Sequence, residues 1–162
     1  MLIFLNIFLI LFLFGFQLIL EGIKNKISDI RSKVTNSLIS LDCVSGLPSI
    51  PFNISDVDTF YFSVQKCFGL PSGLGVWVYN NKCLDKHYNI KEKKITGTYH
   101  SLEKLHKMSL KNQTPETPNV LAIYVLSKVL EDMNNIGIDM IVRDTNYKSS
   151  FCLLYTSDAA DE

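Results

Sequence analysis

An amphipathic segment that runs directly into a short buried segment is the feature that most constrains how this chain can fold. Four apolar residues recur at spacings of four, three and four, with charged residues between them: Ile23, Ile27, Ile30 and Val34. This spacing predicts a helix with one apolar face. The run SLISLDC, Ser37 to Cys43, is largely apolar up to Asp42, which is typical of a parallel strand covered on both faces. A helix followed by a buried strand indicates an α/β fold.

Three later segments continue this pattern. The runs TFYFSV, Thr59 to Val64, and GVWVYNN, Gly75 to Asn81, are rich in aromatic and β-branched residues, and both are predicted to be strands. The residues from Asn119 to Asn135 keep one apolar face and predict a long helix. We expect Thr117 to be the N-cap of this helix and Pro118 to lie in its first turn.

The two ends of the chain differ from its middle. Residues 1–20 are apolar apart from Asn6 and Gln17, which is long enough for a signal anchor that spans a bilayer. No Lys or Arg precedes this run, whereas secretory signals carry a positive segment there. We therefore interpret residues 1–20 as an artefact of reading frame or assembly, with a signal anchor as the alternative. Residues 152–162, CLLYTSDAADE, match the translation of a transposon-end adapter used in sequencing libraries, so we expect the natural sequence to depart near Phe151.

Charge and cysteine content narrow the function classes only slightly. Three of the 16 acidic residues lie in the adapter-like tail, so 16 basic residues face 13 acidic ones in the rest of the chain. This mild balance argues neither for nor against nucleic acid. Cys43, Cys67 and Cys83 have no C-x-x-C spacing, so neither a disulfide framework nor a zinc site is indicated. We expect reduced cysteines in an intracellular protein.

Asp42 and Lys66 stand at the ends of two predicted strands. Asp42 ends the first strand, and Lys66 follows TFYFSV by two residues. Ligands of open α/β sheets lie beyond the carboxyl ends of the strands, so both side chains could point into one crevice. An amine partly removed from water there can lose its proton, as a Schiff-base lysine must. The alternative is that Asp42 caps a following helix and Lys66 is a solvated surface residue, since charged residues are common at strand ends.

These residues also carry a resemblance to a known family. SLDCVSGLP resembles the strand end VDAVSSLP, and FSVQKCFGLPSGLGVW resembles the S-x-Q-K-x-x-G-x-P-x-G segment, of class V pyridoxal-phosphate aminotransferases. The separation of 24 residues between Asp42 and Lys66 fits the family, and QTPETPNVLAIYVLSKVLEDM resembles its T-P-x-T segment and the long helix that follows. The resemblance implies that residues 21–151 are the C-terminal half of the large cofactor-binding domain of a fold-type I aminotransferase and the start of a linker helix. That domain has a three-layer α/β/α architecture around a mostly parallel sheet.

The resemblance implies a role for the residues around the lysine. Lys66 would bind pyridoxal 5'-phosphate as a Schiff base and then act as the catalytic base that moves the substrate proton. Asp42 would pair with the protonated ring nitrogen of the cofactor. Ser63 and Gln65 would flank the lysine, with Gln65 on the cofactor phosphate. Three glycines would let the backbone turn tightly beside this site: Gly69, Gly73 and Gly75.

The resemblance also implies the partners of the whole enzyme. Gln113 and Thr114 match positions that reach the phosphate of the neighbouring subunit's cofactor, so a homodimer is implied. The substrates would be an amino acid of the phosphoserine, serine or alanine class and a 2-oxo acid, in the cytoplasm and without nucleic acid. The family's glycine-rich phosphate turn and its small domain are not matched, so we expect the chain as written to be inactive.

Two alternatives to a transaminase remain. One is a catalytically inactive, single-pass membrane-anchored α/β protein. The other is a desulfurase-like or lyase relative, which would require a catalytic loop cysteine outside this region.

The remaining candidate residues lack a site pattern. His87, His100 and His106 have no ligand spacing and are expected to be surface or loop histidines. Trp77 lies on a predicted strand and is expected in the core. The basic and polar stretch at 82–111 predicts a short helix near Cys83 to Tyr88 and an active-site-type loop around Gly97 to Ser101.

Overall fold

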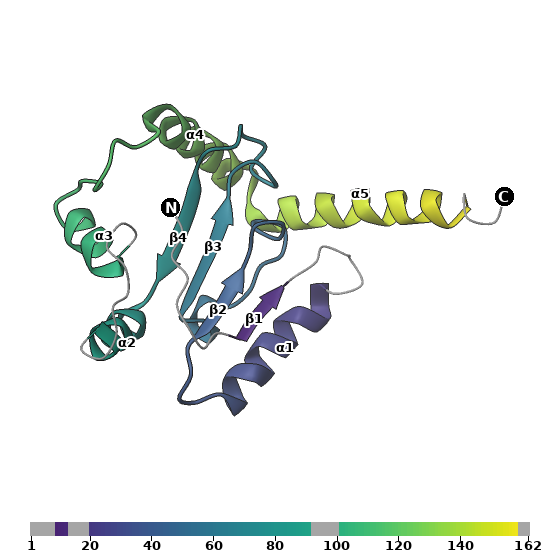
Figure 1. Ribbon diagram of the computed structural model, residues 1–162. Coiled ribbons are helices and arrows are strands. Elements are labelled where there is room, and N and C mark those ends of the chain that lie inside the picture. The colour runs from purple at the N-terminus through teal and green to yellow at the C-terminus, as the bar shows by residue number, and fades with distance from the viewer. Residues whose placement is uncertain (1–8, 13–19, 92–100, 159–162) are drawn as a thin grey trace.

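The computed structural model describes residues 9–12, 20–91 and 101–158, with side chains at 27–90 and 101–152. Four strands and several helices follow one another along the chain (Figure 1). In order they are β1 (Leu9–Phe12), α1 (Leu20–Lys33), β2 (Ile39–Asp42), the short 3₁₀ helix η2 (Ile54–Asp56), β3 (Thr59–Ser63), β4 (Gly75–Tyr79), α2 (Asn81–Lys91), α3 (Leu102–Ser109), α4 (Val120–Ile136) and α5 (Ile138–Asp158).

The strands form one mixed sheet in the order β1-β2-β3-β4. Strands β1, β2 and β3 are parallel to one another, and β4 runs antiparallel to β3. The connection from β3 to β4 covers residues 64–74 without a helix, which suits an antiparallel pair because a parallel return needs a longer crossover. The predicted α/β class with a mostly parallel sheet is confirmed.

Helices cover both faces of the sheet, which makes the three layers that the resemblance implied. One face packs against α1 and α4 through buried apolar side chains, among them Ile27, Ile39, Leu41, Phe60, Phe62 and Leu126. On the other face, Trp77 and Tyr79 pack against a smaller cluster from α2 and α3, made of Cys83, Leu84 and Leu102. Trp77 is half-buried there, and its Nε1 donates a hydrogen bond to Thr59 Oγ1 at 2.7 Å.

Strand β2 differs in one respect from its prediction. Ile39 and Leu41 are 1% and 0% exposed, whereas Ser40 and Asp42 on the opposite face are half-buried. Because side chains alternate along a strand, the two polar residues of β2, Ser40 and Asp42, point to the less covered face. The strand is therefore fully covered on one face only, and its polar face remains available to a site.

A buried carboxylate fixes the opposite, amino-terminal edge of the parallel strands. The side chain of Asp58, just before β3, is 1% exposed. It accepts hydrogen bonds from the Arg31 guanidinium of α1, from the Ile39 N–H of β2 at 2.8 Å and from Asn80 Nδ2 after β4 at 3.0 Å. This one carboxylate joins α1, β2 and the end of β4. It therefore stabilises the edge of the sheet that lies opposite Asp42.

Several helix predictions need correction. The helix expected near Cys83 to Tyr88 is longer and is α2, and two helices, α3 and α5, were not predicted. The predicted cap Thr117 is wrong, because the N-cap of α4 is Asn119, whose side chain accepts a hydrogen bond from the Ala122 N–H at 3.1 Å. Pro118 therefore precedes the helix rather than lying in its first turn.

Two further predictions concern segments at the limit of the described residues. The expected loop at 97–101 lies almost wholly outside them. Part of the apolar N-terminal run, Leu9 to Phe12, is strand β1 and pairs with β2. No helix in the described ranges is both long and apolar enough to cross a membrane.

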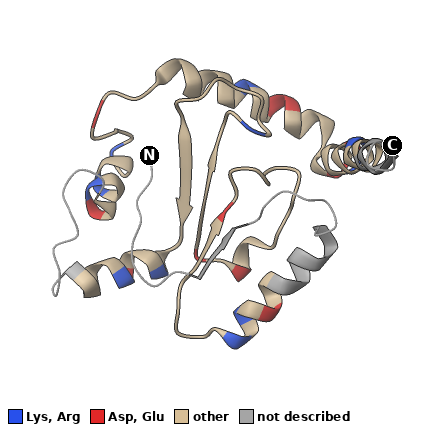
Figure 2. Cartoon of the chain, turned by 45° about the vertical axis from the view of Figure 1, so that its right-hand side comes forward, with Lys and Arg blue, Asp and Glu red and all other residues tan. Residues whose placement is uncertain are grey.

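Charges are distributed without a dominant sign. Figure 2 shows basic and acidic residues interspersed along the helices.

In Figure 1, α5 extends away from the body formed by the sheet and the other helices.

Candidate active site

The carboxyl ends of β2 and β3 meet at one edge of the sheet. Asp42 is the last residue of β2 and lies directly beside Tyr61 of β3 in the parallel register. The Cys43 N–H donates to the Tyr61 carbonyl at 2.9 Å, which continues the pairing past Asp42. Residues paired across neighbouring strands point to the same face, so the side chains of Asp42 and Tyr61 share the polar face of the sheet.

The Asp42 carboxylate is held by two donors. The Val44 N–H donates to its Oδ1 at 2.9 Å, so Asp42 turns back on its own loop, and no helix begins there. The Tyr61 hydroxyl is also hydrogen-bonded to Asp42; burial first, and then this bond and the Asp42 charge, raise the pKa of Tyr61 to about 12. The phenol therefore keeps its proton and donates.

Lys66 lies in the turn that follows β3, near the same edge of the sheet. This turn is closed by the Gly69 N–H on the Lys66 carbonyl at 3.0 Å and by the Leu70 N–H on the Val64 carbonyl at 3.1 Å. The neighbouring Cys67 thiol donates to the Ser45 carbonyl at 3.4 Å. The turn after β3 therefore contacts the loop after β2, which carries Asp42.

The Lys66 amine itself is exposed. Within the side chains that the structure describes, it has no ion-pair or hydrogen-bond partner. The structure thus brings a carboxylate and a lysine to one edge of the sheet, as the strand pattern predicted, and the described side chains leave the lysine amine available for a ligand.

Two of the three predicted turn glycines adopt backbone conformations that favour glycine. Gly69 has φ 67° and Gly73 has φ 121°, and few side-chain-bearing residues tolerate the second value. A Cβ on Gly73 would lie 3.6 Å from Asn119 Nδ2, so the turn passes close to the start of α4. Gly75 is the first residue of β4 and has no such role, which corrects its assignment to the turn.

The two residues that flank the lysine differ in their positions. Ser63 ends β3, pairs with Gly75 and is half-buried on the face of Asp42. Gln65 is exposed in the turn beside Lys66. Both lie within three residues of Lys66, so the segment from Ser63 to Lys66 could contact a single small ligand.

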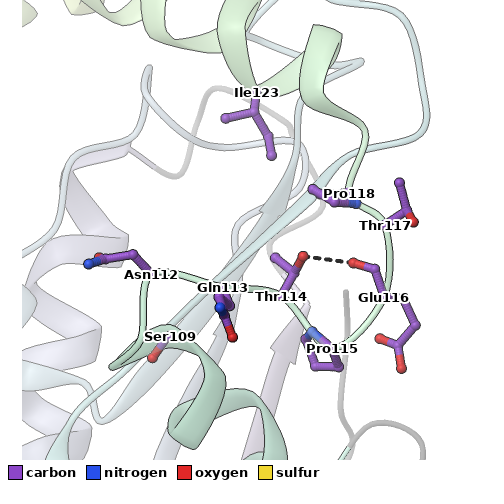
Figure 3. A pocket seen from close by; sticks show the side chains of 9 residues that line it. All are labelled: Ser109, Asn112, Gln113, Thr114, Pro115, Glu116, Thr117, Pro118 and Ile123. Atoms are coloured by element: carbon purple, nitrogen blue, oxygen red, sulfur yellow. Dashed lines mark hydrogen bonds between the residues drawn. The ribbon is translucent and has the colours of Figure 1, made fainter.

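Gln113 and Thr114 lie elsewhere, in the exposed loop between α3 and α4. They line an open pocket together with Ser109, Asn112, Pro115, Glu116, Thr117, Pro118 and Ile123 (Figure 3). Thr114 Oγ1 donates to the Glu116 carbonyl at 2.7 Å, and Lys104 of α3 pairs with the Glu116 carboxylate at 3.0 Å. Neither Asp42 nor Lys66 lines this pocket, so the structure does not bring the two predicted phosphate ligands to the lysine of their own chain.

One histidine prediction is wrong, and one site residue was missed. His87 is 6% exposed and lies in α2, so it is not a surface residue. His106 is half-buried in α3 beside the Tyr79 hydroxyl, 3.2 Å from its Nδ1, and His100 lies outside the described residues. Tyr61 was not singled out from the sequence. The available signal was its position two residues before Ser63, which places both on one face of the strand.

Comparison with protein families matches residues 19–154 to the family described as Aminotransferase class-V. A phosphoserine aminotransferase from Rhodococcus opacus is 34% identical over 103 residues, which cover 63% of this chain and 28% of the relative. One from Corynebacterium glutamicum is 34% identical over 116 residues, 70% of this chain and 31% of the relative. The chain thus spans about a third or less of the length of these relatives.

Solved structures of aminotransferases also match this chain. The crystal structure of a phosphoserine aminotransferase from Cytophaga hutchinsonii matches with a TM-score of 0.76 and 41% identity, covering 82% of this chain and 37% of that one. An aspartate aminotransferase from Thermus thermophilus matches with a TM-score of 0.61 and 20% identity, covering 72% of this chain and 32% of that one. The second likeness is one of fold alone.

Proposed function

The chain belongs to the class V aminotransferase family, and from this premise we propose that it is part of a transaminase that uses pyridoxal 5'-phosphate. The enzyme moves an amino group between an amino acid and a 2-oxo acid. Phosphoserine is the proposed amino donor, because the relatives at 34% and 41% identity carry the name phosphoserine aminotransferase.

The observation that carries this proposal is the placement of Asp42 at the end of β2 and of Lys66 just after the neighbouring parallel strand β3. The residues present fit the cofactor. Asp42 is a half-buried carboxylate that accepts hydrogen bonds from the Val44 N–H and the Tyr61 hydroxyl, and a carboxylate is a suitable partner for a cationic ring nitrogen. Lys66 offers an amine that the described side chains leave unpaired.

Each residue then has a definite task. When bound, pyridoxal phosphate supplies an electron sink for the charge that develops on the substrate α-carbon. Lys66 would hold the cofactor through its amine and would serve as the general base for the proton of the substrate α-carbon. Asp42 would pair with the protonated ring nitrogen. Ser63 and Gln65 would bind the cofactor and its phosphate from the segment beside the lysine.

We further propose a homodimer. Gln113 and Thr114 are exposed in a loop whose pocket excludes Lys66, which supports a role toward the cofactor phosphate of a second subunit. A cytoplasmic location is proposed as well, since Cys43, Cys67 and Cys83 form no disulfide and reduced thiols are typical of that compartment.

The division of the chain remains part of this proposal. Residues 21–151 form the C-terminal half of the large domain and the start of the linker helix. The interpretation of residues 1–20 as an artefact and of 152–162 as adapter sequence also stands as a proposal.

An absorption spectrum tests the function. The protein expressed from its complete gene and loaded with pyridoxal phosphate should show the near-visible band of a lysine-bound cofactor, and Lys66→Ala should abolish it. Lys86→Ala is the matched control, because Lys86 is exposed on α2, and it should keep the band. A protein that takes up no cofactor would refute the proposal, and a band that survives Lys66→Ala would refute the assignment of the lysine.

A further inference from the structure

The Tyr61 hydroxyl stands beside the carboxylate that would hold the cofactor ring. Tyr61 is the middle residue of β3 and lies between Asp42 of β2 and Trp77 of β4 in the register of the sheet. Pairing on both sides fixes its backbone. Its side chain therefore has a defined direction, and its hydroxyl is hydrogen-bonded to the Asp42 carboxylate.

The carboxylate has capacity for this bond and for the cofactor. An ionised Asp accepts at about four lone-pair positions on its two oxygens. The Val44 N–H uses one position on Oδ1 at 2.9 Å, and the Tyr61 hydroxyl uses another. Acceptor capacity thus remains for a ring N–H, and two donors from different directions limit rotation of the carboxylate.

We propose that Tyr61 is a positioning residue that orients the Asp42 carboxylate toward the ring nitrogen of the cofactor. This inference rests on the proposed function. It assigns Tyr61 no contact with the substrate, since the residue acts through Asp42.

The chemistry of the pair supports this role. Because burial and the neighbouring carboxylate raise the pKa of Tyr61 to about 12, the phenol donates at any pH where the enzyme works. A phenol that keeps its proton donates to Asp42 and does not compete for the ring proton. Its loss should therefore weaken the cofactor's ion pair rather than the fold.

The test replaces Tyr61 by Phe in the protein expressed from its complete gene. A hydrogen bond to a charged group is worth enough that pyridoxal phosphate should bind the apoprotein about tenfold more weakly, measured by fluorescence titration. The kcat should fall while KM for the amino donor stays nearly constant, because the ring nitrogen matters most when charge develops on the substrate. Tyr79→Phe is the matched control: its hydroxyl lies on the same face but bonds His106, and cofactor affinity should not change.

A double-mutant cycle separates positioning from structure. In an Asp42→Asn background, Tyr61→Phe should cost less than about twofold in cofactor affinity, because the two residues act as a unit. An equal loss in both backgrounds, or an unchanged affinity in Tyr61→Phe alone, would overturn the inference. In either case a wild-type cofactor band that requires Lys66 would leave the proposed function standing, whereas its absence would remove both.

Discussion

At the scale of single residues, Asp58 is the buried charge on which the stability of the fold depends most. Its carboxylate is 1% exposed, and the Arg31 guanidinium, the Ile39 N–H and the Asn80 amide compensate for its loss of water. Lys82 adds a longer ion pair at 3.8 Å. Removal of one partner from a buried pair leaves the other charge uncompensated, which is far more costly than removal of a surface pair.

Asp58→Asn should therefore lower the free energy of unfolding by about 3 kcal/mol, measured by urea denaturation. Asp56→Asn is the matched control two residues earlier. Asp56 accepts a hydrogen bond from Ser28 in an exposed setting, and its substitution should cost less than about 1 kcal/mol. Equal costs for the two variants would contradict the account of Asp58.

The stability of the fold should also depend on Asp58 in acid. Burial alone would raise its pKa, but hydrogen bonds from Ile39, Asn80 and Arg31 lower it below the usual 3.8. Because the pKa is lower in the folded state, the carboxylate stabilises the fold at pH values above the unfolded pKa. That contribution is lost as the pH falls toward the folded pKa. Below about pH 4, the free energy of unfolding should therefore fall less steeply with decreasing pH for Asp58→Asn than for the wild type. Urea denaturation at a series of pH values measures this.

The sequence predicted which charged residues would meet at the candidate site better than it predicted the contacts that these residues make. Asp42 and Lys66 could be placed together because parallel strands end at one edge of a sheet. The contact of Tyr61 with Asp42 depends on the register between β2 and β3, and a slip of one residue would turn Tyr61 to the other face. Sequence periodicity alone does not set that register.

At the scale of elements, the strands and the long helix could be predicted because their sequences carry a clear pattern of apolar residues. Helix α3 has only eight residues inside a polar stretch, so too few turns exist to show a pattern. Helix α5 exposes apolar side chains, including Ile138, Met140, Tyr147 and Phe151, whereas the polar Thr145, Asn146 and Ser149 lie on its half-buried face. A helix with this distribution gives no 3.6-residue signal.

The start of α4 provides a direct test at this scale. Asn119→Ala should lower the free energy of unfolding by about 1 kcal/mol, because it removes the acceptor for the Ala122 N–H. Thr117→Ala should stay within about 0.5 kcal/mol, since Thr117 is exposed and precedes the cap. A larger loss for Thr117→Ala, measured by thermal unfolding, would restore the cap predicted from the sequence.

At the scale of the whole molecule, apolar surface is the notable feature of α4. Val120, Leu121 and Tyr124 are 66%, 72% and 59% exposed. Apolar residues gathered in this way promote association. The 162-residue chain on its own should therefore elute as more than a monomer in size-exclusion chromatography with light scattering. Leu121→Glu together with Tyr124→Lys should shift it toward the monomer, and a wild-type chain that is already monomeric would contradict this.

The central claim is that Lys66 carries the cofactor, and mass spectrometry tests it most directly. The protein expressed from its complete gene would be loaded with pyridoxal phosphate, treated with borohydride to make the link to the lysine permanent, and digested. We predict the phosphopyridoxyl mass on the peptide that contains Lys66 and on no other lysine. A label on a different lysine, or no label at all, would contradict the account.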